Sequence, residues 1–339
     1  MSVGKKKIGL LAAGIMLALT ASVTFAVSET KAGKNETGVE ESLKDKTVAS
    51  VVLLDDQTEK LFQLSMKKVA EEYGATVIED MNEGELGKEV ELLNQYIEDG
   101  VDGVCIYPVS DTSSVEMLEN TAKQGVKVAL INSGIEADWV TVSAEIDQYH
   151  MGELVGEVCS EYIETHFPDR KANIAIIQFK ALNTKTSQYR TDGFLSKTKD
   201  QINILQDIDA WNIDSSVEVI EEVIYANPDL DLIFSANEGA TEGAVFAVRN
   251  TGRQIPVFGI DISEQLVNML LDDENILQAL GGQDPINLGE TAMRNLCLEM
   301  IGEEYESKIV LPGVLLERSK ETEALEYMNQ IFEVLEEVK

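Results

Sequence analysis

Two strand-like runs of this sequence end on polar side chains that could bind a ligand. The apolar run 255–260 ends at Asp261, the run 232–236 ends at Asn237, and a helix-like segment follows each of them. Open α/β sheets present their ligand-binding groups at the carboxyl ends of the strands. We therefore expect the Asp261 carboxylate and the Asn237 carboxamide to face one crevice.

Further candidates for the same site are polar side chains near strand ends, an arginine and a tryptophan. Carboxylates and carboxamides form bidentate hydrogen bonds, and an indole face packs against the C–H side of a sugar ring. This combination of side chains favours a neutral, polyhydroxylated solute as the ligand. Two other interpretations stay open, because Asp and Asn at strand ends also cap helices or start turns, and a tryptophan also suits a core. The additional candidates are Asp56, Asn132, Arg190, Trp211 and Gln283.

Residues typical of catalytic or metal centres are sparse. His150 and His166 lie in helical patterns, and neither stands beside a nucleophile motif. Cys105, Cys159 and Cys297 have no second cysteine or histidine at metal-ligand spacing, so we expect buried structural thiols, although one disulfide stays open. There is no phosphate-binding glycine loop. The sequence predicts no enzyme, no cofactor and no metal.

The charge of the chain excludes one class of partner. With 61 acidic and 27 basic residues, the formal net charge is −34. Such a surface repels phosphate backbones, so we expect no nucleic-acid partner.

The amino terminus has the pattern of a secretory signal peptide. Three lysines precede an apolar run at 8–19, and small residues end at Ala26. We predict a signal peptide at 1–26, which would act as a membrane anchor if it is not cleaved, and a polar linker at 27–46. The protein is expected to work in the periplasm or outside the cell.

From Thr47 onward, short β-rich runs alternate with segments of helical periodicity. Repeated β-α-β order predicts parallel strands with right-handed crossovers and helices on both faces of the sheet. At 339 residues the chain is long enough for two such lobes. We therefore predict an α/β fold with two doubly wound parallel-sheet lobes. The expected strands are 48–54, 76–78, 103–107, 126–131, 174–177, 202–208, 232–236, 255–260, 276–280 and 309–316.

Over about residues 47–320 the chain resembles the bacterial periplasmic binding proteins for monosaccharides, in particular the galactose/glucose-binding and ribose-binding types. The most specific match is the run IPVFGID, which ends at Asp261. Arg190 in QYRTDGF, Trp211 in DAWN and Asn237 in ANEGA fall on the arginine, the stacking aromatic and the asparagine of the family. The resemblance also implies ligand-binding roles for residues after the first and fourth strands and at the hinge, namely Asp56, Asn132 and Gln283.

The sequence departs from this family at several positions. Thr58 or Glu59 stands where a phenylalanine is expected, so half of the aromatic sandwich is missing, and Ser133 replaces a charged residue. Thr184 and Thr186 occupy positions of a histidine and an aspartate in the galactose/glucose type. The acidic calcium loop is absent from 167–171, so no calcium is expected. These changes leave room for a pentose, a modified sugar, a polyol or a non-sugar solute.

The resemblance implies the type I periplasmic binding protein fold, with two lobes joined by a three-strand hinge. The crossings would lie near 145–147, 283–284 and 312–313. The amino-terminal lobe would comprise 47–146 plus 284–312, and the carboxyl-terminal lobe 147–283 plus 313–339.

The function implied is that of an extracytoplasmic, monomeric solute-binding protein that closes on a sugar-like ligand and delivers it to the membrane permease of an ABC transporter. Two other functions stay open. The closed state could be presented to a chemoreceptor or a histidine kinase, or the protein could act on a glycoside or a nucleoside. A repressor of the related lactose-repressor type is not expected, because the DNA-binding headpiece is missing and the predicted signal peptide occupies its place.

Overall fold

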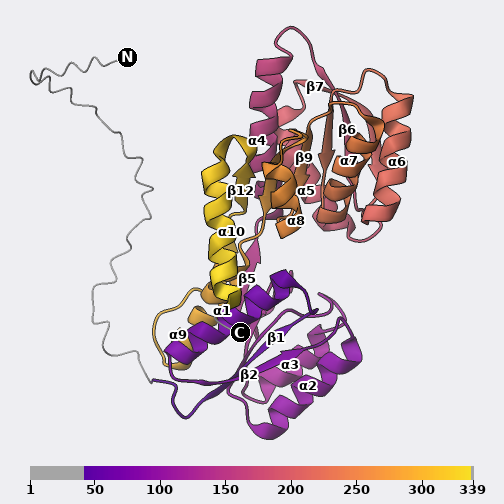
Figure 1. Cartoon of the computed structure of the whole chain (residues 1–339). Helices are drawn as coiled ribbons and strands as arrows, with labels where there is room; N and C mark the ends of the chain where they lie inside the picture. The colour runs from indigo at the N-terminus through magenta and orange to yellow at the C-terminus, as the bar shows by residue number, and fades with distance from the viewer. Residues whose placement is uncertain (1–41, 337–339) are drawn as a thin grey trace, which may run out of the picture. The chain divides into compact units, whose positions relative to one another are not determined.

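The structure is a computed structural model that describes residues 42–336 (Figure 1). The predicted signal peptide at 1–26 lies outside the described residues, and so does most of the predicted linker. Within the described range no helix combines the length and the apolar character needed to cross a bilayer. Residue Leu43, inside the predicted linker, is 2% exposed and packs in the core, so the folded part includes at least this end of the segment.

The first sheet contains six strands in the order β11-β5-β4-β3-β1-β2, and all of its neighbouring strands are parallel. Five of them come from the first half of the chain, whereas β11 comes from near its end. Their bounds are β1 Thr47–Val52, β2 Thr76–Met81, β3 Gly103–Ile106, β4 Lys127–Ile131, β5 Val142–Ile146 and β11 Lys308–Leu311.

The second sheet also contains six strands, in the order β12-β10-β9-β8-β6-β7. Its strands are parallel except for the edge strand β12, which runs antiparallel to β10. Their bounds are β6 Ala172–Gln178, β7 Ile202–Asp209, β8 Leu232–Ser235, β9 Val257–Ile260, β10 Leu277–Gly282 and β12 Val314–Glu317.

Helices cover both faces of the first sheet, and together they form the first lobe. The alternation of side chains along a strand sends Val48 and Cys105 into the core beneath one pair of helices, whereas Val104 and Ile106 face the other pair. The first pair is α1 (Gln57–Glu72) and α9 (Pro285–Met300), and the second is α2 (Leu86–Asp99) and α3 (Val115–Lys123).

The second lobe is built in the same way around the second sheet. Ile174 and Phe234 pack beneath one pair of helices, whereas Ile177 and Ile233 belong to the core on the opposite face. One face carries α4 (Gln148–His166) and α5 (Thr184–Thr198), and the other carries α6 (Ile213–Ala226), α7 (Glu238–Thr251) and α8 (Glu264–Leu271). The prediction of two doubly wound α/β lobes is therefore confirmed.

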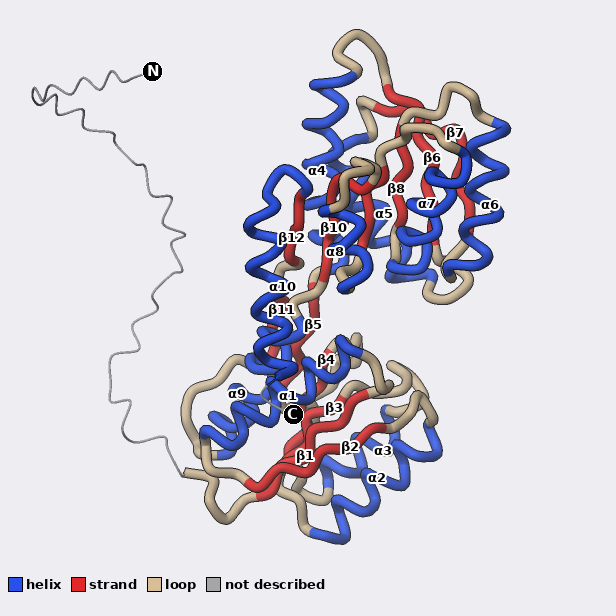
Figure 2. The backbone as a smooth tube through the Cα atoms, viewed as in Figure 1, coloured by secondary structure: helices blue, strands red, loops and turns tan. Residues whose placement is uncertain are grey.

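The chain passes between the two sheets three times: after β5, after β10 and after β11. A short 3-10 helix, Arg318–Lys320, then leads into α10 (Glu321–Glu336), which lies beside β12 and α8 (Figure 2). The same helix also contacts α1 of the first lobe, where Leu61 shares a buried cluster with Met328 and Ile331. Helix α10 is therefore a further connection between the lobes.

Two strand predictions differ from the structure. Strand β5 was not predicted, and the single strand expected at 309–316 is in fact two strands that belong to different sheets. The break falls at Pro312 and Gly313, where proline has no N–H to continue the ladder.

The three cysteines are buried and free, which confirms the expectation of buried thiols. Among residues 42–336 no group of three or more His, Cys, Asp or Glu side chains is placed to hold a metal ion.

Candidate functional site

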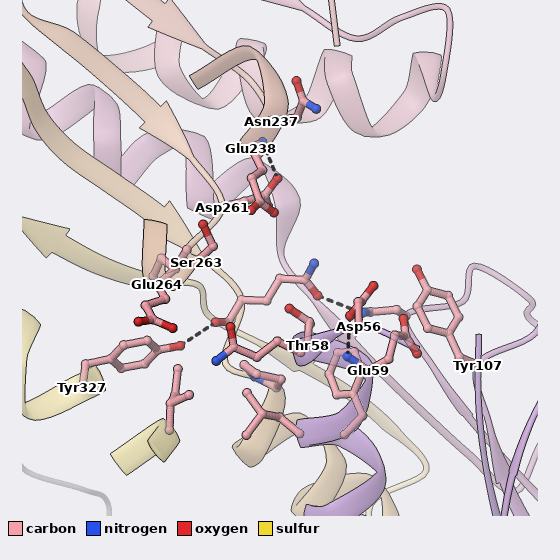
Figure 3. A pocket seen from close by; sticks show the side chains of 18 of the residues that line it. Asp56, Thr58, Glu59, Tyr107, Asn237, Glu238, Asp261, Ser263, Glu264 and Tyr327 are labelled. Atoms are coloured by element: carbon pink, nitrogen blue, oxygen red, sulfur yellow. Dashed lines mark hydrogen bonds between the residues drawn. The ribbon is translucent and has the colours of Figure 1, made fainter. Parts of the chain in front are cut away.

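A cavity of about 300 Å³ opens at the carboxyl ends of strands from both sheets (Figure 3). A second cavity of about 710 Å³ shares four of its lining residues, Tyr107, Asn132, Arg190 and Gln283, so the two cavities adjoin and form one cleft. Volumes of this size suit small-molecule ligands. Six of the seven candidate residues line the first cavity: Asp56, Asn132, Arg190, Asn237, Asp261 and Gln283.

Asp261 ends strand β9 in a conformation that few residues other than glycine adopt. Its φ is 76°, and its Oδ2 accepts hydrogen bonds from Arg190 Nη1 at 3.1 Å and from the Glu238 main-chain N–H at 3.0 Å. Left-handed backbone costs a non-glycine residue of order 1–3 kcal/mol and is concentrated at functional sites. The two hydrogen bonds hold the carboxylate at the mouth of the cleft.

Arg190 is 5% exposed and is fixed by several partners. Its Nε donates to Gln148 Oε1 at 2.8 Å, its Nη1 also donates to the Ala236 carbonyl at 3.0 Å, and its guanidinium lies 5.3 Å from the ring centre of Phe179. The main chain of Arg190 can approach α4 because Gly152 has no side chain: a Cβ there would lie 2.0 Å from the Arg190 carbonyl oxygen. The close crossing of α4 and α5 thus sets the position of the arginine.

Asn132 ends strand β4 and is the second site residue with a left-handed backbone, at φ 48°. Its Nδ2 donates to Gln283 Oε1 at 2.8 Å, and the Gln283 carbonyl accepts from the Tyr327 hydroxyl at 3.1 Å. This chain of hydrogen bonds joins the end of β4, the crossing after β10 and helix α10.

Asp56 and Asn237 each stand at the N-cap position of a helix, but they use their side chains differently. Asp56 Oδ1 accepts the Glu59 N–H at 2.9 Å, so the helix-cap interpretation holds for this residue while it also lines the cavity. Asn237 makes no cap hydrogen bond; its Nδ2 donates to the Trp211 carbonyl at 2.8 Å. Its Oδ1 is buried and receives no donor from the described residues. That oxygen is an unsatisfied acceptor next to the cavity, and it is closed to solvent in this arrangement of the cleft.

Trp211 is the one candidate whose side chain lies outside both cavities. Its carbonyl positions Asn237, but its side chain is 41% exposed and is not among the lining residues. In this structure the indole lies neither in the core nor in the wall of either cavity.

Several lining residues were not among the candidates. Glu59 is 6% exposed, and its Oε2 accepts the Leu53 N–H at 2.9 Å. Burial raises the pKa of Glu59 to about 7, with a smaller contribution from the nearby Asp56 carboxylate. The pKa of Glu238 is also raised, because desolvation of its carboxyl group and the nearby Asp261 and Asp56 carboxylates outweigh a hydrogen bond with Ser263 that lowers it. Burial raises the pKa of Tyr107 to about 12. The only sequence signal for these residues was the expected phenylalanine near Glu59.

Acidic groups line the cavity from two directions. Asp56 and Glu59 come from the start of α1, whereas Glu238 and Asp261 come from the second lobe and face them across the cavity (Figure 3). Among residues 42–336, Arg190 is the only basic side chain in the lining of this cavity.

The chain matches the family model described as the periplasmic binding protein domain over residues 50–304, and it belongs to this family. It is 27% identical to the ABC transporter periplasmic-binding protein YphF of Escherichia coli, over 60% of this chain and 64% of that protein. It is 23% identical to the ribose import binding protein RbsB of Bacillus subtilis, over 67% of this chain and 72% of that protein.

A solved structure with the same fold is an ABC transporter solute-binding protein from Actinobacillus succinogenes with bound D-allose. The TM-score is 0.71 at 19% identity, and the match covers 82% of this chain and 99% of that one. Periplasmic binding proteins are non-enzymatic components of transport. The chain therefore belongs to a family of non-enzymatic binding proteins.

Proposed function

We propose that this protein is the extracytoplasmic binding component of an ABC importer for a monosaccharide or a related polyhydroxylated solute. The observation that carries the proposal is the convergence of strand-end carboxamides, carboxylates and a buried arginine on one cleft, with the Asn237 Oδ1 buried and without a donor. Hydroxyl groups of a polyol supply such donors and also accept from the Arg190 fork. The relatives named for ribose import and the structure that contains D-allose support the same class of ligand.

The binding mechanism follows from the division of the site between the two sheets. Asp56 and Asn132 come from the first lobe, taken as 47–146 plus 284–312, whereas Asn237 and Asp261 come from the second lobe, taken as 147–283 plus 313–339. A solute that touches both sets binds the closed arrangement more tightly than the open one, so it shifts the hinge equilibrium toward closure. The closed form is then recognised by the membrane permease.

The proposal is tested by calorimetry of the purified protein against a panel of pentoses, hexoses and cyclitols. Asp261→Ala removes the acceptor that holds Arg190, and Asn237→Ala removes the unpartnered oxygen, so each should weaken binding at least about tenfold. Asp200→Ala, at an exposed turn, is the matched control and should leave the affinity unchanged. Wild-type affinity in both site variants would exclude this cleft as the binding site.

A further inference from the structure

The charges around the first cavity are strongly unbalanced. Five carboxyl groups line it, from Asp56, Glu59, Glu238, Asp261 and Glu264, against the single guanidinium of Arg190. The charge of that guanidinium is already paired with Asp261, and its Nε and Nη1 also donate to Gln148 and to the Ala236 carbonyl. Within residues 42–336 no ion pair joins any of the other four carboxylates to a lysine or an arginine.

Two lysines lie in the neighbourhood, and neither balances the cavity. Lys185 lines only the second cavity, where its Nζ lies 5.7 Å from the ring centre of Tyr189. Lys60 is exposed and lines an adjoining depression that shares Asp56, Gln57 and Glu264 with the first cavity, but it forms no ion pair with either acid.

The carboxylate of Glu59 is the clearest example of an unpaired negative charge in this cavity. The side chain is 6% exposed and lines the cavity, and one oxygen is held by the Leu53 N–H. Its other oxygen, Oε1, has no hydrogen-bond donor among the described residues and is not closed off from the cavity. A largely buried carboxylate without a neighbouring cation is unfavourable until a cation that also donates hydrogen bonds enters the cavity and binds this oxygen. A protonated amine does so, since it carries one positive charge and up to three N–H donors.

The acids on the opposite wall also favour a cation, although Asp261 is paired with Arg190 and Glu238 is exposed. Asp56 and Glu59 come from the first lobe, and Glu238 and Asp261 from the second, so closure on an uncharged guest brings like charges together in a drier space. Their interaction is already present in this structure, because the Asp261 and Asp56 carboxylates help to raise the pKa of Glu238. A cationic guest turns this repulsion into attraction from both walls.

We propose that the natural ligand carries a protonated amine on its hydroxylated frame, and that Glu59 and Glu238 bind the amine from opposite sides of the cleft. The chemical class is an amino sugar or an amino polyol. This inference rests on the proposed function and specifies its ligand; Asn132, Asn237 and the Arg190–Asp261 pair remain available for the hydroxyl groups.

Calorimetry on matched sugars tests the proposal. Each hexose, pentose or cyclitol is compared with two derivatives of the same frame, one with an amino group and one with an N-acetylamino group in place of one hydroxyl. Only the amino derivative carries a positive charge. We expect the amine to bind at least about tenfold more tightly than either neutral partner, with an affinity that falls as salt rises. Titrations near pH 6.5 in buffers of different ionisation enthalpy should show proton release on binding, because an ammonium group lowers the pKa of Glu59.

Glu59→Gln keeps the size and the acceptor for Leu53 but removes the charge, so it should reduce the preference for the amine about tenfold and abolish most of the proton release. Glu89→Gln is the matched control. Glu89 is also a buried acid, at 0% exposed, with one oxygen held by a main-chain N–H, that of Val109 at 2.7 Å, but it is not among the residues that line either cavity. This variant should keep the wild-type preference.

Native mass spectrometry of protein purified without added sugar identifies any retained ligand, and the proposal expects one whose mass increases on amine acetylation. The inference is overturned if a neutral sugar binds and its amine binds no more tightly, or if Glu59→Gln keeps the full preference; the proposed function survives both results. If neither neutral nor amino-substituted polyols bind, and the retained ligand has no hydroxylated frame, the proposed function fails as well.

Discussion

Replacing Glu59 by Gln should stabilise the ligand-free protein at alkaline pH and leave it nearly unchanged at acidic pH. The pKa of this carboxyl is about 7 in the folded state because it is buried, compared with an ordinary value of 4.5. The folded protein therefore holds the proton more strongly than the unfolded chain between these two values. The contribution of this group to the free energy of unfolding is fully present below about pH 4.5 and is lost as the pH rises to about 7.

The size of the effect follows from the same two pKa values. At 1.36 kcal/mol for each pH unit, ionisation of Glu59 lowers the free energy of unfolding by at most about 3 kcal/mol. Because surrounding groups and water relax around a buried charge, we expect Glu59→Gln to gain about 2 kcal/mol over the wild type at pH 8 and less than about 0.5 kcal/mol at pH 5. Gln retains an oxygen for the Leu53 N–H.

Urea unfolding at both pH values measures this difference. Trp139 packs on the core of the first lobe, so its fluorescence in a Trp211→Phe background reports the lobe that contains Glu59. Carboxylates that titrate below pH 5 affect both proteins equally and cancel in the comparison. A gain of the same size at pH 5 and pH 8 would show that Glu59 is not a buried acid with a raised pKa, and the argument from its burial would fail.

Three further predictions concern the packing around the cleft and the state of the cysteines. Gly152→Ala places a Cβ 2.0 Å from the Arg190 carbonyl, so it should cost about 1–3 kcal/mol in chemical unfolding and weaken ligand binding, whereas Gly87→Ala, which has no atom within 4 Å of its Cβ, should do neither. Ile331→Ala removes a side chain that is 6% exposed between α10 and α1 and should cost about 2–5 kcal/mol; a loss below 0.5 kcal/mol would mean that α10 does not pack there. Because all three thiols are free, a reductant should leave the melting temperature unchanged, and a decrease would reveal a disulfide.

The fold was largely predictable because most strands are buried on both faces and form continuous apolar runs. Strand β5 was not, because its sequence, Val-Ser-Ala-Glu-Ile, alternates buried with half-buried residues and contains two polar side chains. Its place in the sheet depends on β4 on one side and on β11 on the other. The β11 contact joins distant parts of the chain, which no local pattern reveals.

Some residues of the candidate site could likewise be predicted from the sequence, and others could not. Asn237 and Asp261 could be predicted because the carboxyl end of a parallel strand is a position that the local sequence marks. Tyr327 could not, since it reaches Gln283 only through the packing of the last helix. The sequence also did not indicate that the Trp211 ring lies outside the cavity, because the path of the segment after β7 decides where that ring points.

The first lobe draws its sheet and helices from two distant stretches of the chain. Strand β11 and helix α9, which covers β3, β4 and β5, are synthesised only after the whole second sheet except β12. An emerging chain therefore exposes one apolar face of β3, β4 and β5, together with the side of α1 that packs against α9, until residue 311 has appeared. Native contacts of such long range form slowly. This lobe cannot be completed during synthesis of the amino-terminal half, so a chaperone or a translocation machinery has a long interval in which to engage it unfolded.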